Sequence, residues 1–152
     1  MAENGKKMIC MNRRARFDYD ISETLEAGLV LQGTEVKSLR DGRASLKDAY
    51  AELLNGEMFL LHAHIDQYEQ GNRANHDPER PRKLLMHRRE IHRLASKAQE
   101  KGLTLIPTRM YFSKGKAKVE LGLAKGKKLH DKRQDIQRRS AQRDIERAMR
   151  GE

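Results

Sequence analysis

Residues 48–65 read DAYAELLNGEMFLLHAHI, and this stretch decides the fold class. Two segments rich in apolar residues, about Asp48–Leu54 and Glu57–Ile65, flank the pair Asn55-Gly56. Asn-Gly between such segments is the strongest short-range signal for a two-residue hairpin turn, because both turn positions need a positive φ. The stretch therefore predicts two antiparallel strands.

The second of these strands has a period-two pattern with two histidines. We expect Phe59, Leu61, Ala63 and Ile65 on one face and His62 and His64 on the other. The two histidines would need a third ligand to hold a metal ion, and Asp66 and His76 are not at diagnostic spacings. A solvated strand face is the plainer interpretation, and a metal-dependent nuclease is the alternative.

Short strand-like runs continue on both sides of the hairpin. They are Phe17–Ile21, Leu25–Leu31, Leu103–Ile106, Arg109–Ser113 and Lys116–Ala124, with a break at Pro107 and a turn at Lys114-Gly115. About six short antiparallel strands lose their free edges most simply by closing into a barrel. We predict a mainly β fold, a small antiparallel barrel of the oligonucleotide-binding (OB) type with added helices.

Two segments have helical spacing instead. They are Thr34–Arg40, with Thr34 as cap and Asp41-Gly42 as the end, and residues 87–101, with an apolar stripe of Ile91, Leu94, Ala95 and Ala98 before Gly102. The polar stretch 66–83 is predicted to be a long loop.

The charged residues are unevenly distributed along the chain. The 152 residues include 32 Lys+Arg and 22 Asp+Glu, for a formal net charge of +10. Residues 17–70 carry four basic and eleven acidic side chains, so that part has a net charge of −7 and the rest +17. A basic surface beside an acidic remainder indicates nucleic-acid binding. A solvated surface with chance clustering is the alternative.

Composition excludes several classes of protein. No apolar run approaches the roughly 20 residues that cross a bilayer, and Met8–Met11 is too short for the core of a signal peptide. The single cysteine, Cys10, excludes an internal disulfide framework and a cysteine-based zinc finger. We expect a soluble, cytoplasmic protein with no membrane partner.

Signatures of catalysis are missing from the sequence. No glycine-containing stretch matches a P-loop or dinucleotide fingerprint. His76-Asp77 precedes Pro78, which is typical of a turn opening, and Cys10 has no neighbouring base to activate it. We therefore expect no enzymatic activity, no cofactor and no metal.

Clusters of cations mark the candidate binding segments instead. These are Arg80-Pro81-Arg82-Lys83, His87-Arg88-Arg89 and Lys125-Gly126-Lys127-Lys128. Tryptophan is absent, and Phe and Tyr total seven. Proteins that bind single strands need exposed aromatic platforms, so this composition favours a folded RNA recognised through phosphate, 2′-OH and shape. DNA is the alternative that composition alone leaves open.

The chain changes character after Ala124. Residues 125–152 are highly charged, and their large apolar residues are too sparse to hold a helix on a core. We expect three parts: a flexible N-terminus (1–11), the barrel (12–124) and a basic tail (125–152). The tail is expected to be disordered alone and helical on a partner. A coiled-coil strand would need heptads that the tail lacks.

Several long motifs resemble the SsrA-binding protein family (small protein B). They are NRRAR at 12–16, EAG at 26–28, QGTEVKSLR at 32–40, DPERPRKLL at 77–85, KGLT at 101–104 and GKKLHDKR at 126–133. The resemblance runs from about residue 12 to the end. Where the family often has His after the first motif, this chain has Phe17, so any role of that His is in doubt here.

The resemblance implies a non-catalytic protein that binds transfer-messenger RNA (SsrA RNA), the molecule that rescues ribosomes stalled without a stop codon. An OB-type barrel would grip the tRNA-like domain, and the body would stand in for the missing anticodon arm. The tail would enter the decoding centre and empty mRNA channel of the small subunit, and elongation factor Tu would belong to the delivery complex. The alternative is a structural ribosomal or ribosome-assembly protein.

The resemblance and the basic clusters give two sets of candidate residues. Those for RNA binding are Asn12, Arg13, Arg14, Arg16, Glu35, Lys37, Arg40, Asn72, Asn75, Arg82, Lys83, Leu84, Leu85, His87, Lys125, Gly126, Lys127 and Lys128. Those for ribosome contact by the tail are His130, Asp131, Lys132, Arg133, Arg138, Arg139, Arg143 and Met149. Glu35 would accept hydrogen bonds from base or 2′-OH donors, or else be an acid favoured by the first turn of its helix.

Overall fold

Nine strands and three helices make up the part of the chain that the computed structural model describes, residues 6–70 and 75–126. The strands are β1 (Lys6–Met11), β2 (Tyr19–Leu29), β3 (Ala44–Ser45), β4 (Tyr50–Leu54), β5 (Glu57–Leu61), β6 (His64–Ile65), β7 (Arg82–Leu85), β8 (Thr104–Ser113) and β9 (Lys116–Gly126). The helices are α1 (Ala15–Asp18), α2 (Gly33–Arg40) and α3 (Arg88–Lys101).

Six of the strands close into a ring. The hydrogen-bonded order is β8-β4-β5-β7-β2-β9, and β9 pairs back onto β8. All of these pairings are antiparallel, and β1 adds to the outside of the ring on β8. The predicted mainly β barrel of about six strands with added helices is confirmed.

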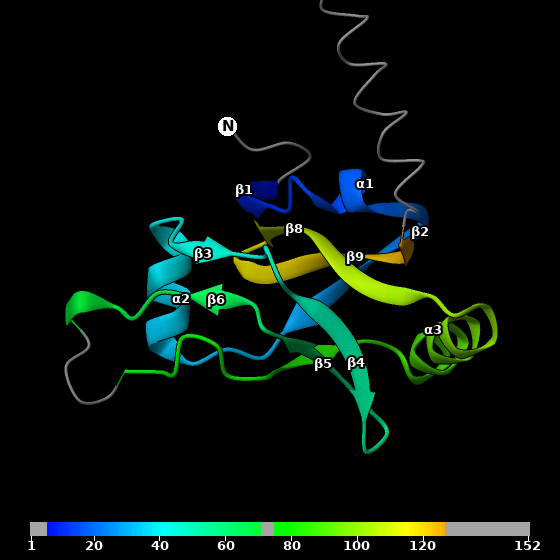
Figure 1. Ribbon diagram of the computed structural model, residues 1–152. Helices are drawn as coiled ribbons and strands as arrows, with labels where there is room; N and C mark the ends of the chain where they lie inside the picture. The colour runs from blue at the N-terminus through cyan, green and yellow to red at the C-terminus, as the bar shows by residue number, and fades with distance from the viewer. Residues whose placement is uncertain (1–5, 71–74, 127–152) are drawn as a thin grey trace, which may run out of the picture.

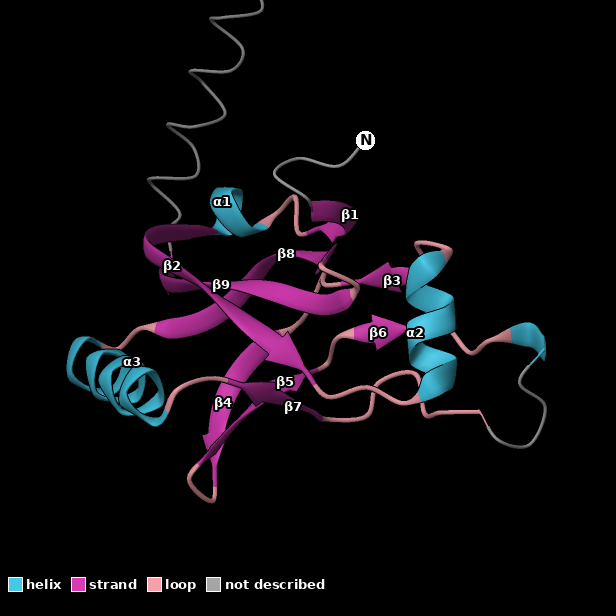
Figure 2. Ribbon diagram, turned by 180° about the vertical axis from the view of Figure 1, so that it is seen from behind, coloured by secondary structure: helices cyan, strands magenta, loops and turns pink. Residues whose placement is uncertain are grey.

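The helices lie at different sides of this barrel. Figure 1 shows α2 and the small β3–β6 sheet on one side, α3 on the opposite side, and α1 with β1 at one end. Figure 2, from behind, shows the same separation. The β4–β5 hairpin extends away from the end that carries α1.

The predicted hairpin forms at Asn55-Gly56. The two residues have φ of 51° and 80°, as a two-residue hairpin turn requires. The strands pair from Tyr50 with Leu61 to Leu54 with Glu57.

The predicted facing of the second hairpin strand is wrong in its first half. Met58 and Leu60 face the core, at 1% and 0% exposure, instead of Phe59 and Leu61. His62 then takes a left-handed conformation with φ of 59° and ends β5. This kink shifts the alternation by one residue, because a strand otherwise exposes every second side chain on one face. Ala63 and Ile65 are therefore buried as predicted.

The N-terminal elements differ from the prediction. Lys6–Met11, expected to be flexible, forms β1 on β8. Residues 15–18 form the single turn α1, so the strand expected from Phe17 begins at Tyr19 and continues without a break to Leu29. Pairing partners about a hundred residues away decide both differences, and a local pattern does not reveal them.

Strand β8 is continuous where two runs separated by Pro107 were expected. Its register with β9 shifts between Pro107 and Arg109. A proline has no N–H to donate to a ladder, and a bulge is where a strand tolerates one.

The stretch 66–83, predicted as a loop, ends in a strand. Arg82 and Lys83 begin β7, which pairs with β5 and β2 and is needed to close the ring. The short strand β3 was also not predicted, and it pairs with β6.

Both predicted helices are present. Helix α3 ends at Gly102 as expected. Helix α2 is capped by Gln32 rather than Thr34: Gln32 and Glu35 cap each other reciprocally, and Thr34 contacts His76 instead.

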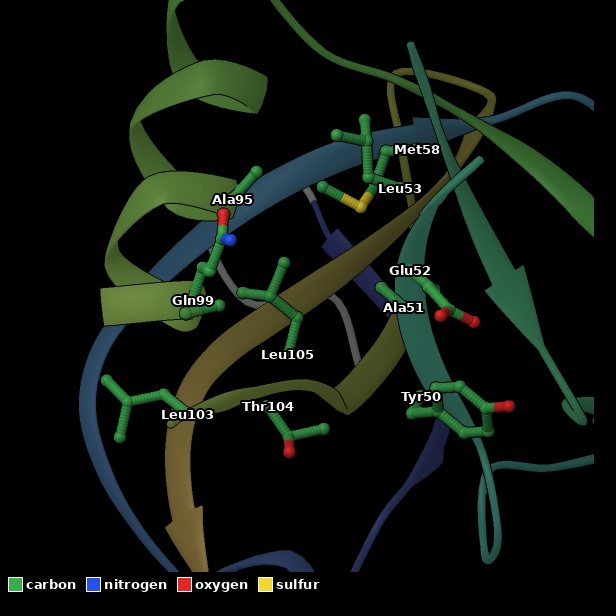
Figure 3. Close-up of a pocket in the computed structure, with 11 residues that line it drawn as sticks. Tyr50, Ala51, Glu52, Leu53, Met58, Ala95, Gln99, Leu103, Thr104 and Leu105 are labelled. Atoms are coloured by element: carbon green, nitrogen blue, oxygen red, sulfur yellow. The ribbon is translucent and has the colours of Figure 1, made fainter. Parts of the chain in front are cut away.

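The core fills the ring, and α3 contributes little to it. The only residue of α3 that is fully buried is Leu94. A cavity of about 470 Å³ lies between α3 and strands β4 and β8. Figure 3 shows Ala95 and Gln99 of the helix facing Leu105 across it. Among the described residues, no helix is long and apolar enough to cross a membrane.

Candidate nucleic-acid interface

A buried ion-pair network joins α2 to β7. The carboxylate of Glu35 accepts hydrogen bonds from Arg80 Nη2 and from Arg82 Nε, each at 2.5 Å, and from the backbone N–H of Gln32 at 2.8 Å. Glu35 and Arg82 are both 0% exposed. Arg82 also donates to the carbonyl of Ala63 at 2.7 Å. The network fixes the segment that leads into β7.

The pKa of Glu35 reflects this network. Burial alone would raise the pKa of its carboxyl, but hydrogen bonds from Arg80, from the Gln32 backbone and from Arg82 outweigh burial and hold the pKa below its usual range. Glu35 is therefore ionised and fully paired. A charge so paired is typical of structural support.

Three predicted RNA-binding residues lie below the surface. Glu35, Arg82 and Leu84 are 0%, 0% and 2% exposed. The Glu35 carboxylate therefore presents no acceptor at the surface in this structure, where Arg80, Arg82 and the Gln32 backbone occupy it. The Arg82 guanidinium likewise donates its hydrogen bonds to Glu35 and to backbone carbonyls.

Two further predicted residues are engaged in structure. The Asn75 side chain accepts from the N–H of Tyr68 at 3.0 Å and donates to its carbonyl. The Asn12 side chain donates to the carbonyls of Leu46 and Pro107, at 3.3 Å and 3.0 Å. Both amides shape the chain around them.

Other predicted residues near β7 and α2 are accessible. Leu85 is 55% exposed, and His87 precedes the first turn of α3. Lys83 forms a surface ion pair with Glu57 at 3.5 Å. Lys37 lies over the Tyr68 ring, and Arg40 is exposed. These cations can exchange their present contacts for phosphate at small cost, because surface pairs are weak.

A second group of predicted cations lies at the end of the barrel that carries α1. Arg13, Arg14 and Arg16 are exposed there. Arg14 pairs with Asp18 at 3.5 Å and lies over the ring of Phe17, where the family often has His.

The end of β9 joins this second group. Tyr19 pairs with Gly126, and Asp20 pairs with Lys125. The basic residues at 13–16 and the start of the basic tail thus lie at the same end of the barrel. They lie apart from the accessible residues near α2 and β7 that were described above (Figure 1).

The remaining predicted residues lie outside the described part of the chain. They are Asn72, Lys127, Lys128, His130, Asp131, Lys132, Arg133, Arg138, Arg139, Arg143 and Met149.

The histidines of the metal hypothesis do not converge. His62 is exposed in the kink after β5, and His64 Nε2 lies 2.9 Å from Asp66 Oδ1. No group of three His, Cys, Asp or Glu side chains suited to a metal ion occurs within residues 6–70 and 75–126. His76 is buried between Thr34 and the carbonyl of Ile65, each at 2.9 Å.

Sequence reasoning missed the outer face of β2 and β9. Gly28 and Lys118 are paired there, and Gly28 is also paired with Leu85. Gly28 belongs to the EAG motif at 26–28, which was the available signal. Lys118 belongs to none of the quoted motifs, and its place in an alternating strand does not mark it as a functional residue.

Comparison with known proteins gives consistent matches. A family model described as "SmpB protein" matches residues 9–151. An SsrA-binding protein from Desulforudis audaxviator is 63% identical over 151 residues, which cover 99% of each chain. One from Geobacillus thermodenitrificans is 59% identical over 150 residues, covering 99% of this chain and 97% of that protein.

A solved structure also matches. It is described as "tmRNA-SmpB: a journey to the center of the bacterial ribosome", and its matching chain is 53% identical with a TM-score of 0.67. The match covers 79% of this chain and 85% of that one.

Proposed function

Since the chain belongs to the SmpB protein family, we propose that it binds transfer-messenger RNA (SsrA RNA) and acts in trans-translation without catalysing a reaction. The observation that carries the proposal is the match to SsrA-binding proteins along nearly the whole chain. The closed barrel with its exposed cations supports an RNA ligand, because phosphate contacts supply most of the affinity of such surfaces.

The barrel binds the tRNA-like domain of SsrA RNA. Lys83, Leu85 and His87 follow directly from the segment that Glu35 holds in place. Glu35 and Arg82 therefore act as positioning residues: they set the geometry of β7 so that its exposed residues and those at the start of α3 face the RNA together. Lys37 and Arg40 on α2 supply further phosphate contacts.

The tail engages the ribosome. Its residues follow Gly126 at the end of the barrel that also carries Arg13, Arg14 and Arg16. In this proposal the body takes the place of the missing anticodon arm, and residues 127–152 enter the decoding centre and the empty mRNA channel. Delivery takes place in a complex with elongation factor Tu.

Sequencing the RNA that co-purifies with the full-length protein tests the proposal. SsrA RNA enriched far above its cellular share is the expected result. Stoichiometric recovery of ribosomal RNA from all ribosomes, translating and stalled alike, would indicate the alternative of a structural ribosomal or ribosome-assembly protein.

A further inference from the structure

The barrel is open on the side where β4 separates from β8. Among the described residues, these two strands pair only at Ala51 with Leu105, whereas β4 pairs with β5 along its whole length. The cavity of about 470 Å³ in Figure 3 opens between the two strands and α3. Ala95, Ala98 and Gln99 of the helix line it, and the two alanines are too short to fill it. We call this opening the α3 groove.

The lining of the α3 groove is apolar, with one acid. Leu53, Met58 and Leu105 supply large apolar side chains, and Leu53 is 39% exposed. Glu52 is the one charged residue among those that line the groove. Within residues 6–70 and 75–126 its carboxylate has no ion-pair partner. An exposed apolar surface rimmed by a polar group marks an interaction site, and the free acid favours a partner that carries a cation.

The end of β9 brings the basic tail close to the α3 groove. Thr104, which lines the groove, is paired with Ala124. The described barrel ends at Gly126, two residues beyond that pair, and residues 127–152 lie outside the described part of the chain. The stretch 127–144 spans up to roughly 60 Å when extended, about twice the diameter of a small domain. The segment that follows it therefore reaches the groove without strain.

One segment of the tail matches the lining of the groove. Ile145, Ala148 and Met149 are spaced at i, i+3 and i+4, which places them on one face of a helix. Arg147 and Arg150 flank this apolar stripe. Three apolar residues are too few to build a core of their own, but a preformed groove needs only one apolar turn to fill it. The two arginines supply the cation that the free acid of the groove favours.

We propose that residues 145–150 of this same chain occupy the α3 groove while the protein is free of the ribosome. The apolar stripe packs against Leu53 and Met58, and an arginine pairs with Glu52. The groove thereby holds the basic tail on the body and keeps its cations from the phosphates of bulk RNA, which attract any exposed cluster of lysine and arginine. Under the function proposed above, the tail leaves the groove when it enters the ribosome.

Disulfide trapping in the full-length protein tests this contact. In a Cys10→Ala background, Gln99→Cys places one thiol at the groove and Ala148→Cys places the other in the apolar stripe. The matched control combines Ala148→Cys with Ser96→Cys, which is exposed on the same helix and does not line the groove. A disulfide requires Cα atoms within about 7 Å of each other, so the rate of oxidation reports close contact.

The two pairs of cysteines share nearly the same tether and differ in docking alone. We therefore expect the pair with Gln99→Cys to form an intrachain disulfide at least about tenfold faster than the pair with Ser96→Cys. Equal rates would overturn the proposal, because a tail that does not dock meets both positions alike. Disulfide-linked dimers would also overturn it and would identify the tail of a second copy as the occupant. Equal thermal unfolding midpoints of the two reduced variants establish that α3 is intact in both.

Two further substitutions in the trapping variant test what the groove recognises. Met149→Ser should lower the rate to that of the control, whereas Ile136→Ser, outside the apolar stripe, should leave it unchanged. Glu52→Gln should slow trapping about two- to fivefold, as expected for an exposed ion pair, and the exposed Glu79→Gln should have no effect.

An unchanged rate with Met149→Ser would overturn the apolar docking, and an unchanged rate with Glu52→Gln would overturn the ionic contact. The assay contains neither RNA nor ribosomes, so its result is independent of the proposed function.

Discussion

The buried carboxylate of Glu35 pairs with the guanidinium groups of Arg80 and Arg82, and this pairing holds the start of β7 against α2. Glu35→Gln keeps the shape of the side chain but leaves Arg82 charged and without its buried counter-ion. We expect a loss of about 3 kcal/mol in the free energy of unfolding, at the lower end of the range for breaking a buried pair, because Arg82 keeps its carbonyl acceptors. Urea titration measures it.

Glu57→Gln is the matched control for this variant. It breaks the exposed pair with Lys83, whose side chains are 44% and 50% accessible, and should cost less than about 1 kcal/mol. Equal losses in the two variants would contradict the structural role of Glu35.

The same carboxyl predicts a pH dependence. Its pKa is lower in the folded protein than the value of about 4.3 for an unfolded chain. Its stabilisation is therefore complete above that value and is lost as the pH falls through the folded pKa. The difference in unfolding free energy between wild type and Glu35→Gln should be widest above about pH 5 and shrink below about pH 4.

Cys10 is predicted to be unreactive in the folded protein. Burial raises the pKa of its thiol to about 11, and the thiolate is the nucleophile. At pH 8 we expect alkylation by iodoacetamide about a hundredfold slower in the native protein than in urea, where the pKa returns to about 8.5. Similar rates in both conditions would show an ionised thiol in the native state.

For single residues, the sequence locates a cluster of cations but does not show which of them are buried and which lie at the surface. Arg82 and Lys83 are adjacent cations in one basic cluster, yet the first is buried and the second is at the surface. The difference arises from the alternation of β7 and from Glu35, which lies 47 residues away. Neither fact is visible in the local pattern.

Helix α3 is held to the barrel by few contacts. Leu94 anchors it from one face, and Arg93 and Lys97 both pair with Glu23 of β2. The cavity in Figure 3 lies beneath the helix. An element with so little buried surface opens more readily than the sheet.

Leu94→Ala should release α3 while the ring persists. Truncating a buried leucine costs about 2–5 kcal/mol, and most of the loss should appear in the helix. Hydrogen exchange followed by mass spectrometry should show faster exchange in residues 88–101 and slower, native-like exchange in β8 and β9. Ser96→Ala, on the exposed side of α3, is the control, and uniform acceleration across the chain would refute the prediction.

Elements with local signals could be predicted, and those defined by distant partners could not. The Asn55-Gly56 hairpin and the amphipathic stripe of α3 are encoded within about 15 residues each. Strands β1 and β7 are short, and they become strands because β8, β2 and β5 offer them hydrogen bonds. The left-handed conformation of His62 shifts the alternation of buried and exposed residues by one position, which alternation alone did not predict.

The whole molecule divides at Gly126, where the described barrel ends. Removing residues 127–152 leaves every strand of the ring intact, including the pair of Tyr19 with Gly126. We expect affinity for the SsrA tRNA-like domain within a few-fold of wild type, and no tagging of nascent chains in a reconstituted stalled-ribosome assay. A wholesale loss of RNA affinity would contradict this division of labour.

The closure of the ring by β9 also sets when the chain can fold. Strand β9 pairs along its length with both β2 and β8, and its partners in β2 lie about a hundred residues earlier. Contacts of such high sequence separation make folding slow, because loop entropy is lost before they form. During synthesis the closing strand β9 is incomplete until residue 126 has been added. A message broken upstream of the codons for β9 therefore yields a chain that lacks the strand needed to close the ring.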